Sequence, residues 1–541
     1  MRAAPMPTRD RPVDASAGSE SGRTGSGLLR ASGLVALCTL ASRVLGLVRD
    51  SLGAALFGAG WEYGVFNLAW LLPNLFRRLF GEGALASAFV PAFARALRES
   101  GDAGARRLVA SVAGALIALL GLLCAAGAAA AVLLPPGAIA PLLGESRDAS
   151  LLLRLSAILS PYLLLVCLYA LATAILNSLG RFFLPAVAPA LLNVVWIAGL
   201  GVLTLLRPAT LEAAASLLAF FVLAGGVAQL ALQLPALRAA GFLPRPRLDT
   251  AHAPFRGVVR DMGPIVLGLA VVQLNLVVDQ AMAWAFVAPG ANTYIYLGNR
   301  LMQFPLSLVG AAAATASFPA LAHRAAEGDF VGFRRAHDRI LGFVVFLAAP
   351  AGAGLLALAE PVVRLLFEHG RFGAEDSRAA AGAVRMYACG VPFFCAAQIL
   401  TRAHYALGDV RTPVRAAVAL VFANVLLNLA LVRPMGVAGL ALATTICSAL
   451  NVAVLAVALR AREIIPPSTD LLGRLARSAI AAAGTGLVTW GCFRAAVAGG
   501  LALLPCVGAA LLAGAGSHFV SALLLRSPEL NEVREAVARR N

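Results

Sequence analysis

The sequence contains no lysine, few charged residues of any kind and none of the common motifs of soluble enzymes. Charged residues make up 13% of the 541 residues and hydrophobic ones 60%, whereas soluble domains are about 45–50% apolar even with glycine counted. This composition excludes a soluble globular protein and a disordered one. No G-x-x-x-x-G-K-[ST], H-E-x-x-H or G-x-S-x-G motif occurs, which excludes a P-loop ATPase and argues against common hydrolase chemistry. We therefore expect the chain not to be an enzyme.

The eight cysteines and six histidines also lack the patterns of redox or metal chemistry. Each cysteine stands alone in an apolar run, and no C-x-x-C or metal-ligand spacing occurs. Such cysteines are typical of small core residues and not of a disulfide framework. The histidines are dispersed, so we expect no catalytic histidine and no organic cofactor.

Long apolar runs fill most of the chain and predict a membrane protein. A spanning helix needs about 20 mostly apolar residues, because only an internally hydrogen-bonded backbone is stable in hydrocarbon. We predict an all-α integral membrane protein with fourteen transmembrane helices. They begin near Leu28, Glu62, Arg106, Ser150, Leu184, Leu211, Phe255, Ala291, Phe330, Asp376, Thr412, Met435, Leu471 and Gly499.

The distribution of arginine predicts the orientation in the membrane. All 44 basic residues are arginine and the net charge is +17, an excess that in a soluble chain would indicate nucleic-acid binding. Between the predicted helices, 30 arginines fall on one side and 9 on the other. Because cytoplasmic loops collect positive charge, we expect a multi-pass protein with both termini in the cytoplasm and no nucleic-acid partner.

The chain contains a weak internal duplication at an offset of about 228 residues. L-G-x-x-x-x-P occurs at residues 179–185 and at 407–413, and Asp50 matches Asp279 at an offset one residue longer. Because six helices per copy is an even number, the copies are parallel repeats, which are typical of secondary transporters. We predict a disordered tail, two six-helix lobes, two extra helices and a C-terminal tail. Their bounds are residues 1–27, 28–240, 241–463, 464–526 and 527–541.

Five arginines lie well inside apolar segments, where a lipid-facing arginine costs about 2.5–3.5 kcal/mol. They are Arg43, Arg49, Arg77, Arg78 and Arg300. At that cost, we expect most of them to face a wet cavity between the lobes. An alternative for the adjacent pair at 77 and 78 is snorkelling from a helix broken at Pro73.

The acidic neighbours of these arginines are Asp50, Glu82 and Asp279, which leaves the buried set net positive. Spacing places Arg43 and Asp50 on one helix face and lets Arg78 pair with Glu82. The other three arginines have no obvious acidic partner on their own helices. Because guanidinium groups donate bidentately and stay charged, the set predicts an anionic substrate that carries a phosphate or pyrophosphate.

A second group of polar residues carries a single acid. Asp279, the pair Asn424 and Asn428 one turn apart, and Thr444 together offer oxygen atoms, the ligands that hard cations prefer. A Na⁺ site is one interpretation. The other is interhelical hydrogen bonding, which is common in membranes and contributes about 0.6 kcal/mol on average.

An ordered series of motifs resembles the MurJ (MviN) family of bacterial lipid II flippases, within the multidrug/oligosaccharidyl-lipid/polysaccharide (MOP) exporter superfamily. The series covers nearly the whole chain except the N-terminal tail. It comprises SRVLGLVRD at 42–50, FGAG at 57–60, LPNLFRR at 72–78, EGA at 82–84, NRLMQFP at 299–305, LFEHGRF at 366–372, YALGDVRTPV at 405–414 and GVAGLA at 436–441.

The resemblance implies a lipid II flippase of the bacterial inner membrane, acting in cell-wall synthesis. The substrate would be undecaprenyl-pyrophosphate that carries a disaccharide-pentapeptide, bound in a central cationic cavity while the extra helices hold the lipid tail. Membrane lipids and cell-wall enzymes would be its other partners. By the family pattern, Arg43, Arg49, Arg77 and Arg300 match functional arginines. The tentative Na⁺ set likewise matches residues that hold sodium in some members, so Na⁺ is an expected coupling ion.

The chain departs from the family pattern at four positions, where relatives carry an acid or a lysine and this sequence has Gly64, Leu71, Asn299 and Asn428. Asn299 removes an acidic partner from Arg300, and Asn428 offers a sodium ion only a neutral oxygen. Three rival functions follow from the residues. They are a flippase for another prenyl-pyrophosphate-linked saccharide, a drug/cation antiporter with an acidic cavity, and a structural membrane protein.

Overall fold

The computed structural model describes residues 17–81, 83–143, 146–461 and 469–530, and the regular structure in these ranges is helical. The N-terminal half contains α1 (Ala17–Phe57), α2 (Trp61–Phe76), η1 (Arg77–Gly81), α3 (Ala84–Leu133), α4 (Pro136–Leu143), α5 (Ser146–Leu159), α6 (Pro161–Ser178), α7 (Phe183–Leu206) and α8 (Leu211–Ala239). The rest contains α9 (Ala253–Phe286), α10 (Asn292–Pro305), η2 (Leu306–Ala311), α11 (Ala312–Ala326), α12 (Phe330–Ala357), α13 (Ala359–Phe367), α14 (Ala374–Ala406), α15 (Arg411–Met435), α16 (Val437–Arg460), α17 (Thr469–Ala498) and α18 (Leu503–Leu524).

The predicted all-α membrane architecture is confirmed, while fourteen transmembrane helices remains a prediction. Ten helical stretches in the described ranges are long and apolar enough to span a membrane. One of them runs from Trp61 to Leu133 as a single stretch, although Gly101 interrupts it with a φ of +60°. The structure starts α1 at Ala17, ahead of the predicted start near Leu28. The remainder of the predicted N-terminal tail lies outside the described residues.

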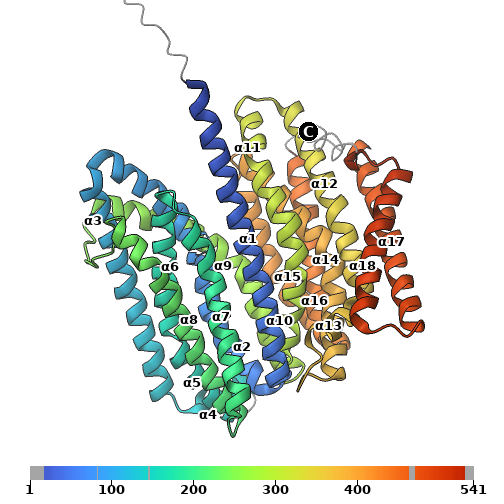
Figure 1. Ribbon diagram of the computed structural model, residues 1–541, viewed down its shortest axis with the longest axis horizontal. Coiled ribbons are helices and arrows are strands. Elements are labelled where there is room, and N and C mark those ends of the chain that lie inside the picture. Colours follow the sequence, from blue (N-terminus) through green and yellow to red (C-terminus); the bar gives the residue numbers. More distant parts are fainter. Residues whose placement is uncertain (1–16, 82, 144–145, 462–468, 531–541) are drawn as a thin grey trace, which may run out of the picture.

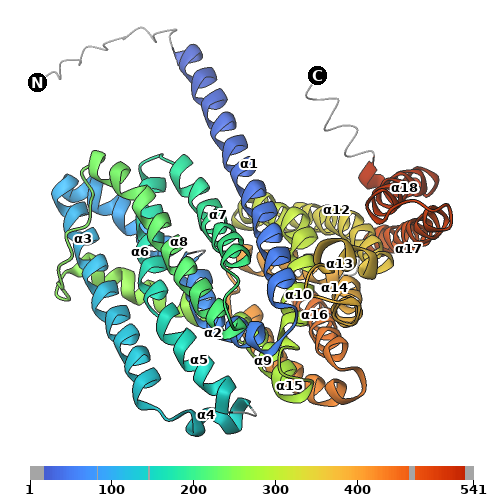
Figure 2. The ribbon, with the colours of Figure 1, turned by 60° about the horizontal axis from the view of Figure 1, so that its bottom comes forward.

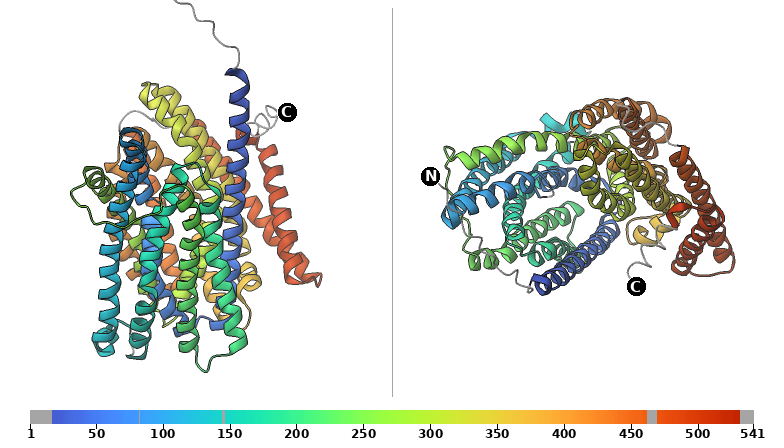
Figure 3. Two further views of the ribbon diagram at one scale, coloured as in Figure 1. Left: turned by 60° about the vertical axis from the view of Figure 1, so that its left-hand side comes forward. Right: turned by 90° about the horizontal axis from the view of Figure 1, so that it is seen from above.

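The helices form two bundles that lie side by side (Figure 1). α1 to α8 build the N-terminal lobe, and α9 to α16 build the C-terminal lobe, with α1 running along the boundary between them (Figure 2). The pair α17 and α18 packs on the outer side of the C-terminal lobe beside α12 (Figure 3). The start of α1 and the end of α18 lie at the same end of the molecule (Figure 1).

Helix bounds follow the internal duplication found in the sequence. α5 and α14 begin at Ser146 and Ala374, and α7 and α15 begin at Phe183 and Arg411. Both pairs are offset by 228 residues. The glycines of the repeated L-G-x-x-x-x-P motif, Gly180 and Gly408, share a φ of +73°, a conformation that glycine adopts at no steric cost. The helix starts and the glycine conformation of the two lobes therefore repeat at the offset found in the sequence.

A short π-helix follows α2 in one lobe and α10 in the other, again at nearly the repeat offset. α2 contains Pro73 and α10 ends at Pro305. Proline lacks the N–H that continues an α-helix, so the backbone near it adopts another pattern. Such π segments are frequent at functional sites, and η1 begins with Arg77 and Arg78.

The lobes touch closely at the end opposite the start of α1. The side-chain amide of Asn292 donates to the carbonyl of Gly64 at 2.9 Å, and the backbone N–H of Arg371 donates to Ala55 O at 2.8 Å. A Cβ atom on Gly64 would lie 2.6 Å from the Cα of Gly290. The two backbones can approach this closely because both residues lack a side chain.

Candidate substrate cavity between the two lobes

A cavity of about 510 Å³ lies between the lobes, and all five arginines predicted from the apolar segments line it. Arg43 and Arg49 come from α1, Arg77 and Arg78 from η1, and Arg300 from α10. None of the described residues that line this cavity is acidic. The arginines of both lobes thus converge on one chamber, as predicted from the sequence.

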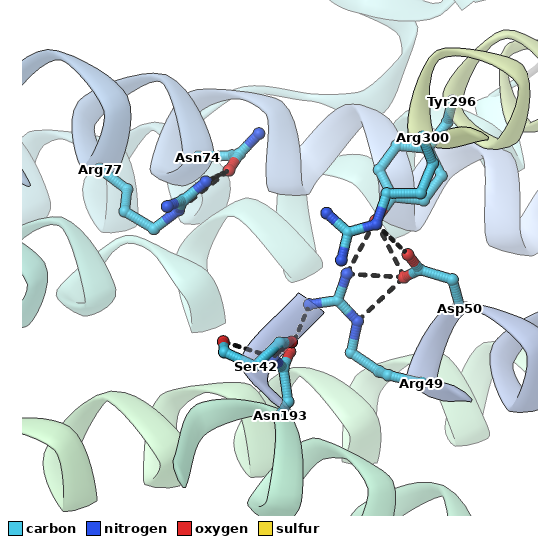
Figure 4. Close-up of polar contacts among 8 residues, drawn as sticks. All are labelled: Ser42, Arg49, Asp50, Asn74, Arg77, Asn193, Tyr296 and Arg300. Atoms are coloured by element: carbon cyan, nitrogen blue, oxygen red, sulfur yellow. Dashed lines mark hydrogen bonds and ion pairs between the residues drawn. The ribbon is translucent and has the colours of Figure 1, made fainter. Parts of the chain in front are cut away.

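Asp50 joins a cation of each lobe at the wall of this cavity. Its Oδ1 lies 2.6 Å from Nη2 of Arg49 on the same helix, and its Oδ2 lies 2.9 Å from Nε of Arg300 on α10 (Figure 4). The expectation of no acidic partner on the same helix was wrong for Arg49, whereas Arg300 finds its acid on the other lobe. Arg49 is long enough to fold back onto its sequence neighbour, and Arg300 reaches across from the other lobe, a contact that spacing within one helix cannot reveal.

Arg49 is fixed by neighbours on three sides. Its Nη1 donates to Oδ1 of Asn193 at 3.2 Å, and its Nη2 donates to the Tyr296 hydroxyl at 2.9 Å (Figure 4). The guanidinium carbon lies 4.4 Å from the centre of the Trp196 ring, a cation–π distance. Asn193 also donates to the carbonyl of Ser42 at 2.9 Å, so its amide orientation is set by two different partners.

Arg77 and Arg78 donate hydrogen bonds to neutral side chains. Arg77 donates to Oδ1 of Asn74 at 3.0 Å, in a place separate from the Asp50 group (Figure 4). Arg78 donates to Oε1 of Gln273 on α9 at 3.1 Å. Both arginines line the cavity, which favours the cavity interpretation over snorkelling. Glu82, the predicted partner of Arg78, lies outside the described residues.

The charge balance of the described site is strongly positive. Five guanidinium groups face the chamber, while Asp50, which is 1% exposed, neutralises one charge for the pair that it joins. Arginine forks bind phosphate oxygens bidentately and remain charged at any physiological pH. The arrangement suits an anion with several oxygen acceptors, such as a diphosphate.

A second cavity of about 600 Å³ runs between the C-terminal lobe and the pair α17 and α18. Its lining is mainly apolar, with Leu308, Leu355 and Leu511 among the residues that form it. Arg43 and Arg300 line both this apolar groove and the cationic cavity. The two spaces therefore meet at these arginines, where a charged group and a long hydrocarbon chain of one molecule would join.

The four residues of the predicted Na⁺ set also come together, inside the C-terminal lobe. Oδ1 of Asp279 accepts from Asn428 at 2.7 Å, and its Oδ2 accepts from Thr444 at 2.8 Å. Asn428 also donates to Asn424 at 3.0 Å. The interhelical hydrogen bonding that was one of the two interpretations is therefore present.

The same cluster passes a simple test of fit to a small cation. Oδ1 of Asn428 is buried and has no hydrogen-bond partner, although buried polar atoms are normally satisfied. This oxygen, together with those of Asp279, Asn424 and Thr444, supplies the hard ligands that Na⁺ would need. The donor set fits, with a single carboxylate.

Sequence reasoning missed the residues that orient the arginines. Asn193 and Trp196 lie on α7 and Tyr296 lies on α10, and each is a residue type that is also common in ordinary helix packing. A polar asparagine in the long apolar stretch Phe183–Leu206 was the one available signal, because polar groups inside membrane helices usually have a function or a partner.

Solved structures with this architecture are transporters. A lipid II flippase MurJ in an inward closed conformation matches with a TM-score of 0.73 and 24% identity, over 91% of this chain and 99% of that one. An inward-facing multidrug resistance MATE family transporter of the MOP superfamily matches with a TM-score of 0.63 and 14% identity, over 78% and 94%. The chain thus shares its two-lobed fold with these two solved transporters.

Sequence comparison assigns the family within that class. A family model for the lipid II flippase MurJ matches residues 53–505. A probable lipid II flippase MurJ from Vibrio cholerae is 35% identical over 479 residues, which cover 86% of this chain and 89% of that protein. The lipid II flippase MurJ of Burkholderia cenocepacia is 33% identical over 449 residues, or 82% and 86% of the two chains. The chain belongs to the lipid II flippase MurJ family.

Proposed function

We propose that this protein moves lipid II across the bacterial inner membrane by alternating access of the cavity between its lobes. The observation that carries the proposal is the convergence of five arginines from both lobes on one chamber, which shares Arg43 and Arg300 with an apolar groove. Lipid II combines a diphosphate with a long prenyl chain, and the two spaces match these two parts. The substrate crosses unchanged, so the protein acts as a transporter and not as an enzyme.

The diphosphate binds to Arg49, Arg77 and Arg300, which come from three different helical segments. Arg49 and Arg300 are already held in place by Asp50 and Tyr296, so little side-chain freedom is lost on binding. The prenyl chain lies in the apolar groove along α17 and α18. Arg43, at the junction of the two spaces, contacts the phosphate that carries the chain.

Transport requires the lobes to change their relative angle, as in transporters built from repeats. The contact at Gly64 and Gly290 closes one end of the cavity through backbone atoms and a few hydrogen bonds. Buried apolar side chains also cross this boundary, because Ala54 of α1 packs in one cluster with Leu297 and Phe367 of the C-terminal lobe, so separation of the lobes must break these contacts too. The Arg300 to Asp50 ion pair crosses the same boundary, so occupation of the cavity by a diphosphate competes with a contact between the lobes.

The positive-inside distribution of arginine supports a cytoplasmic location of both termini. The shared end of α1 and α18 supports a common side for the two termini (Figure 1). Moving one elementary charge across the membrane potential involves about 2.3 kcal/mol per 100 mV, which is enough to bias the return of an empty, positively charged cavity. The enzymes that make and use lipid II remain predicted partners.

A sodium ion is the proposed coupling ion, held by Asp279, Asn424, Asn428 and Thr444. When bound, it would supply a positive charge beside the buried Asp279 carboxylate. The orphan oxygen of Asn428 supports this role. Asp279 is tied to α15 and α16 by its hydrogen bonds, so the charge state of the cluster affects how α9 packs in the C-terminal lobe.

The basic cavity argues against the rival drug/cation antiporter, which needs acidic residues for its substrate. A flippase for another prenyl-pyrophosphate-linked saccharide would bind the same phosphates. Only the saccharide headgroup distinguishes its substrate from lipid II. The test is a proteoliposome assay that compares fluorescent lipid II with an undecaprenyl-pyrophosphate carrying an unrelated saccharide. We expect transport of lipid II and rescue of a bacterium depleted of its own MurJ. Transport of only the unrelated lipid would reject the proposal.

A further inference from the structure

Gly46 lies on α1 at the point where α1, α7 and α10 meet. A Cβ atom at this position would overlap with Nη2 of Arg300 and would lie 3.3 Å from Cζ of the same guanidinium. The next nearest atom is Nδ2 of Asn193, at 3.7 Å. The head of Arg300 therefore occupies the volume that any side chain at residue 46 would fill.

Gly46 precedes Asp50 by one helical turn, so the two residues share a face of α1. The Nε atom of Arg300 lies 2.9 Å from Asp50, while its Nη2 lies over Gly46. The guanidinium group thus extends along α1 from the carboxylate to the glycine. Asn193, which binds Arg49 and Ser42, lies 3.7 Å from the same Cβ position through its Nδ2 atom.

We infer that Gly46 is a positioning residue for the substrate headgroup, because its missing side chain lets Arg300 of the C-terminal lobe lie against α1 beside Arg49. The inference rests on the proposed function, since it concerns the pair of cations that bind the diphosphate. A methyl group at residue 46 moves the Arg300 head off α1 and out of reach of Asp50. The cations of the two lobes then no longer face one diphosphate.

The surroundings of Gly46 indicate that a methyl group there would displace the Arg300 side chain and leave the helices in place. Glycine in a helix interior is less favourable than alanine, and Gly46 lies well inside α1, so its presence is explained by the close approach. The group in the way is the free end of a flexible side chain. The helices can stay where they are while Arg300 adopts another rotamer. Gly64 differs, because a Cβ there would meet backbone atoms, which cannot move in this way.

The test measures lipid II binding and thermal unfolding of the purified full chain in nanodiscs. We expect Gly46→Ala to weaken lipid II binding at least tenfold and to lower the unfolding midpoint less than Asp50→Asn does, because Asp50 keeps Arg49 and Tyr296 as partners. Gly201→Ala is the matched control, because this glycine lies inside α7 and a Cβ there meets no atom within 4 Å. It is expected to leave lipid II binding unchanged and to raise the unfolding midpoint slightly, because alanine is the better helix former.

A double-mutant cycle separates positioning from packing, since coupled residues show non-additive effects. On an Arg300→Gln background, Gly46→Ala is expected to have no further effect on binding. Unchanged binding by Gly46→Ala, an unfolding midpoint as low as that of Asp50→Asn, or full additivity with Arg300→Gln would each overturn the inference while the proposed function stands. Failure of the unmodified chain to bind lipid II would overturn both.

Discussion

Asp50 and Asp279 occupy matching places in the two repeats, yet their surroundings differ completely. Asp50 is paired with Arg49 and Arg300 at the wall of the central cavity. Asp279 is surrounded by neutral amides and a hydroxyl inside the C-terminal lobe. A duplicated acid thus has two kinds of partner. Asp50 is held by two guanidinium groups, and Asp279 accepts hydrogen bonds from an amide and a hydroxyl.

The largest expected effect comes from removing the cation that bridges the lobes. Arg300→Ala leaves Asp50 with Arg49 and the Tyr296 hydroxyl as partners and takes one proposed phosphate ligand out of the cavity. We expect lipid II transport to fall to the level of protein-free vesicles, and rescue of a MurJ-depleted bacterium to be lost, while the protein still inserts. Arg260→Ala, at an exposed site with an 83% exposed side chain, is the control. Normal transport by Arg300→Ala would contradict the account.

Removing the shared acid tests the Asp50 half of the comparison. Asp50→Asn leaves two guanidinium groups without their carboxylate, and breaking a buried pair in this way costs about 3–5 kcal/mol. Unfolding free energy in mixed micelles is the measurement. The control Asp261→Asn removes an exposed pair with Arg260, for which at most about 1 kcal/mol is expected. Equal losses for the two variants would show that Asp50 has no special structural role.

The surroundings of Asp279 predict that the stability of the fold depends on the sodium concentration. If Na⁺ binds only the folded chain, a concentration of 100 times its Kd stabilises the fold by about 2.7 kcal/mol. We expect this stabilisation in the unmodified protein and its loss in Asp279→Asn. Asp50→Asn should keep the sodium effect despite its lower stability. A sodium effect that survives in Asp279→Asn would place the ion elsewhere.

The smallest expected effect comes from adding a second carboxylate beside Asp279, which makes its surroundings differ still more from those of Asp50. Asn428→Asp puts a second carboxylate beside Asp279, whose Oδ1 lies 2.7 Å from the Asn428 amide nitrogen. Two adjacent carboxylates repel each other and attract a cation, so Na⁺ affinity should rise about tenfold, or about 1.4 kcal/mol. Sodium titration of the unfolding midpoint measures this. An unchanged affinity would indicate that residue 428 is not a ligand.

The sequence carried enough information for the architecture and for the position of the cavity. Apolar runs predicted the helices, and arginines that could not face lipid predicted a chamber between the lobes, which Arg77 and Arg300 indeed line. Their cost in hydrocarbon is a property of the residue and needs no knowledge of contacts. The helices of the two lobes likewise begin at the repeat offset found in the sequence, as α7 and α15 do.

The pairing within the site could not be predicted in the same way. That Arg300 shares Asp50 with Arg49 depends on the angle between the lobes and on the space left by Gly46. The role of Asn193 depends on α7 packing against α1. Spacing along one helix reveals which side chains share a face, whereas contacts between helices require the three-dimensional arrangement.

The most direct test of the central claim is an experimental structure of the chain with lipid II bound. The account predicts that the diphosphate contacts Arg49, Arg77 and Arg300 in the cavity, with the prenyl chain leaving along α17 and α18. A diphosphate bound outside this cavity, with the three arginines in contact only with protein, would contradict it.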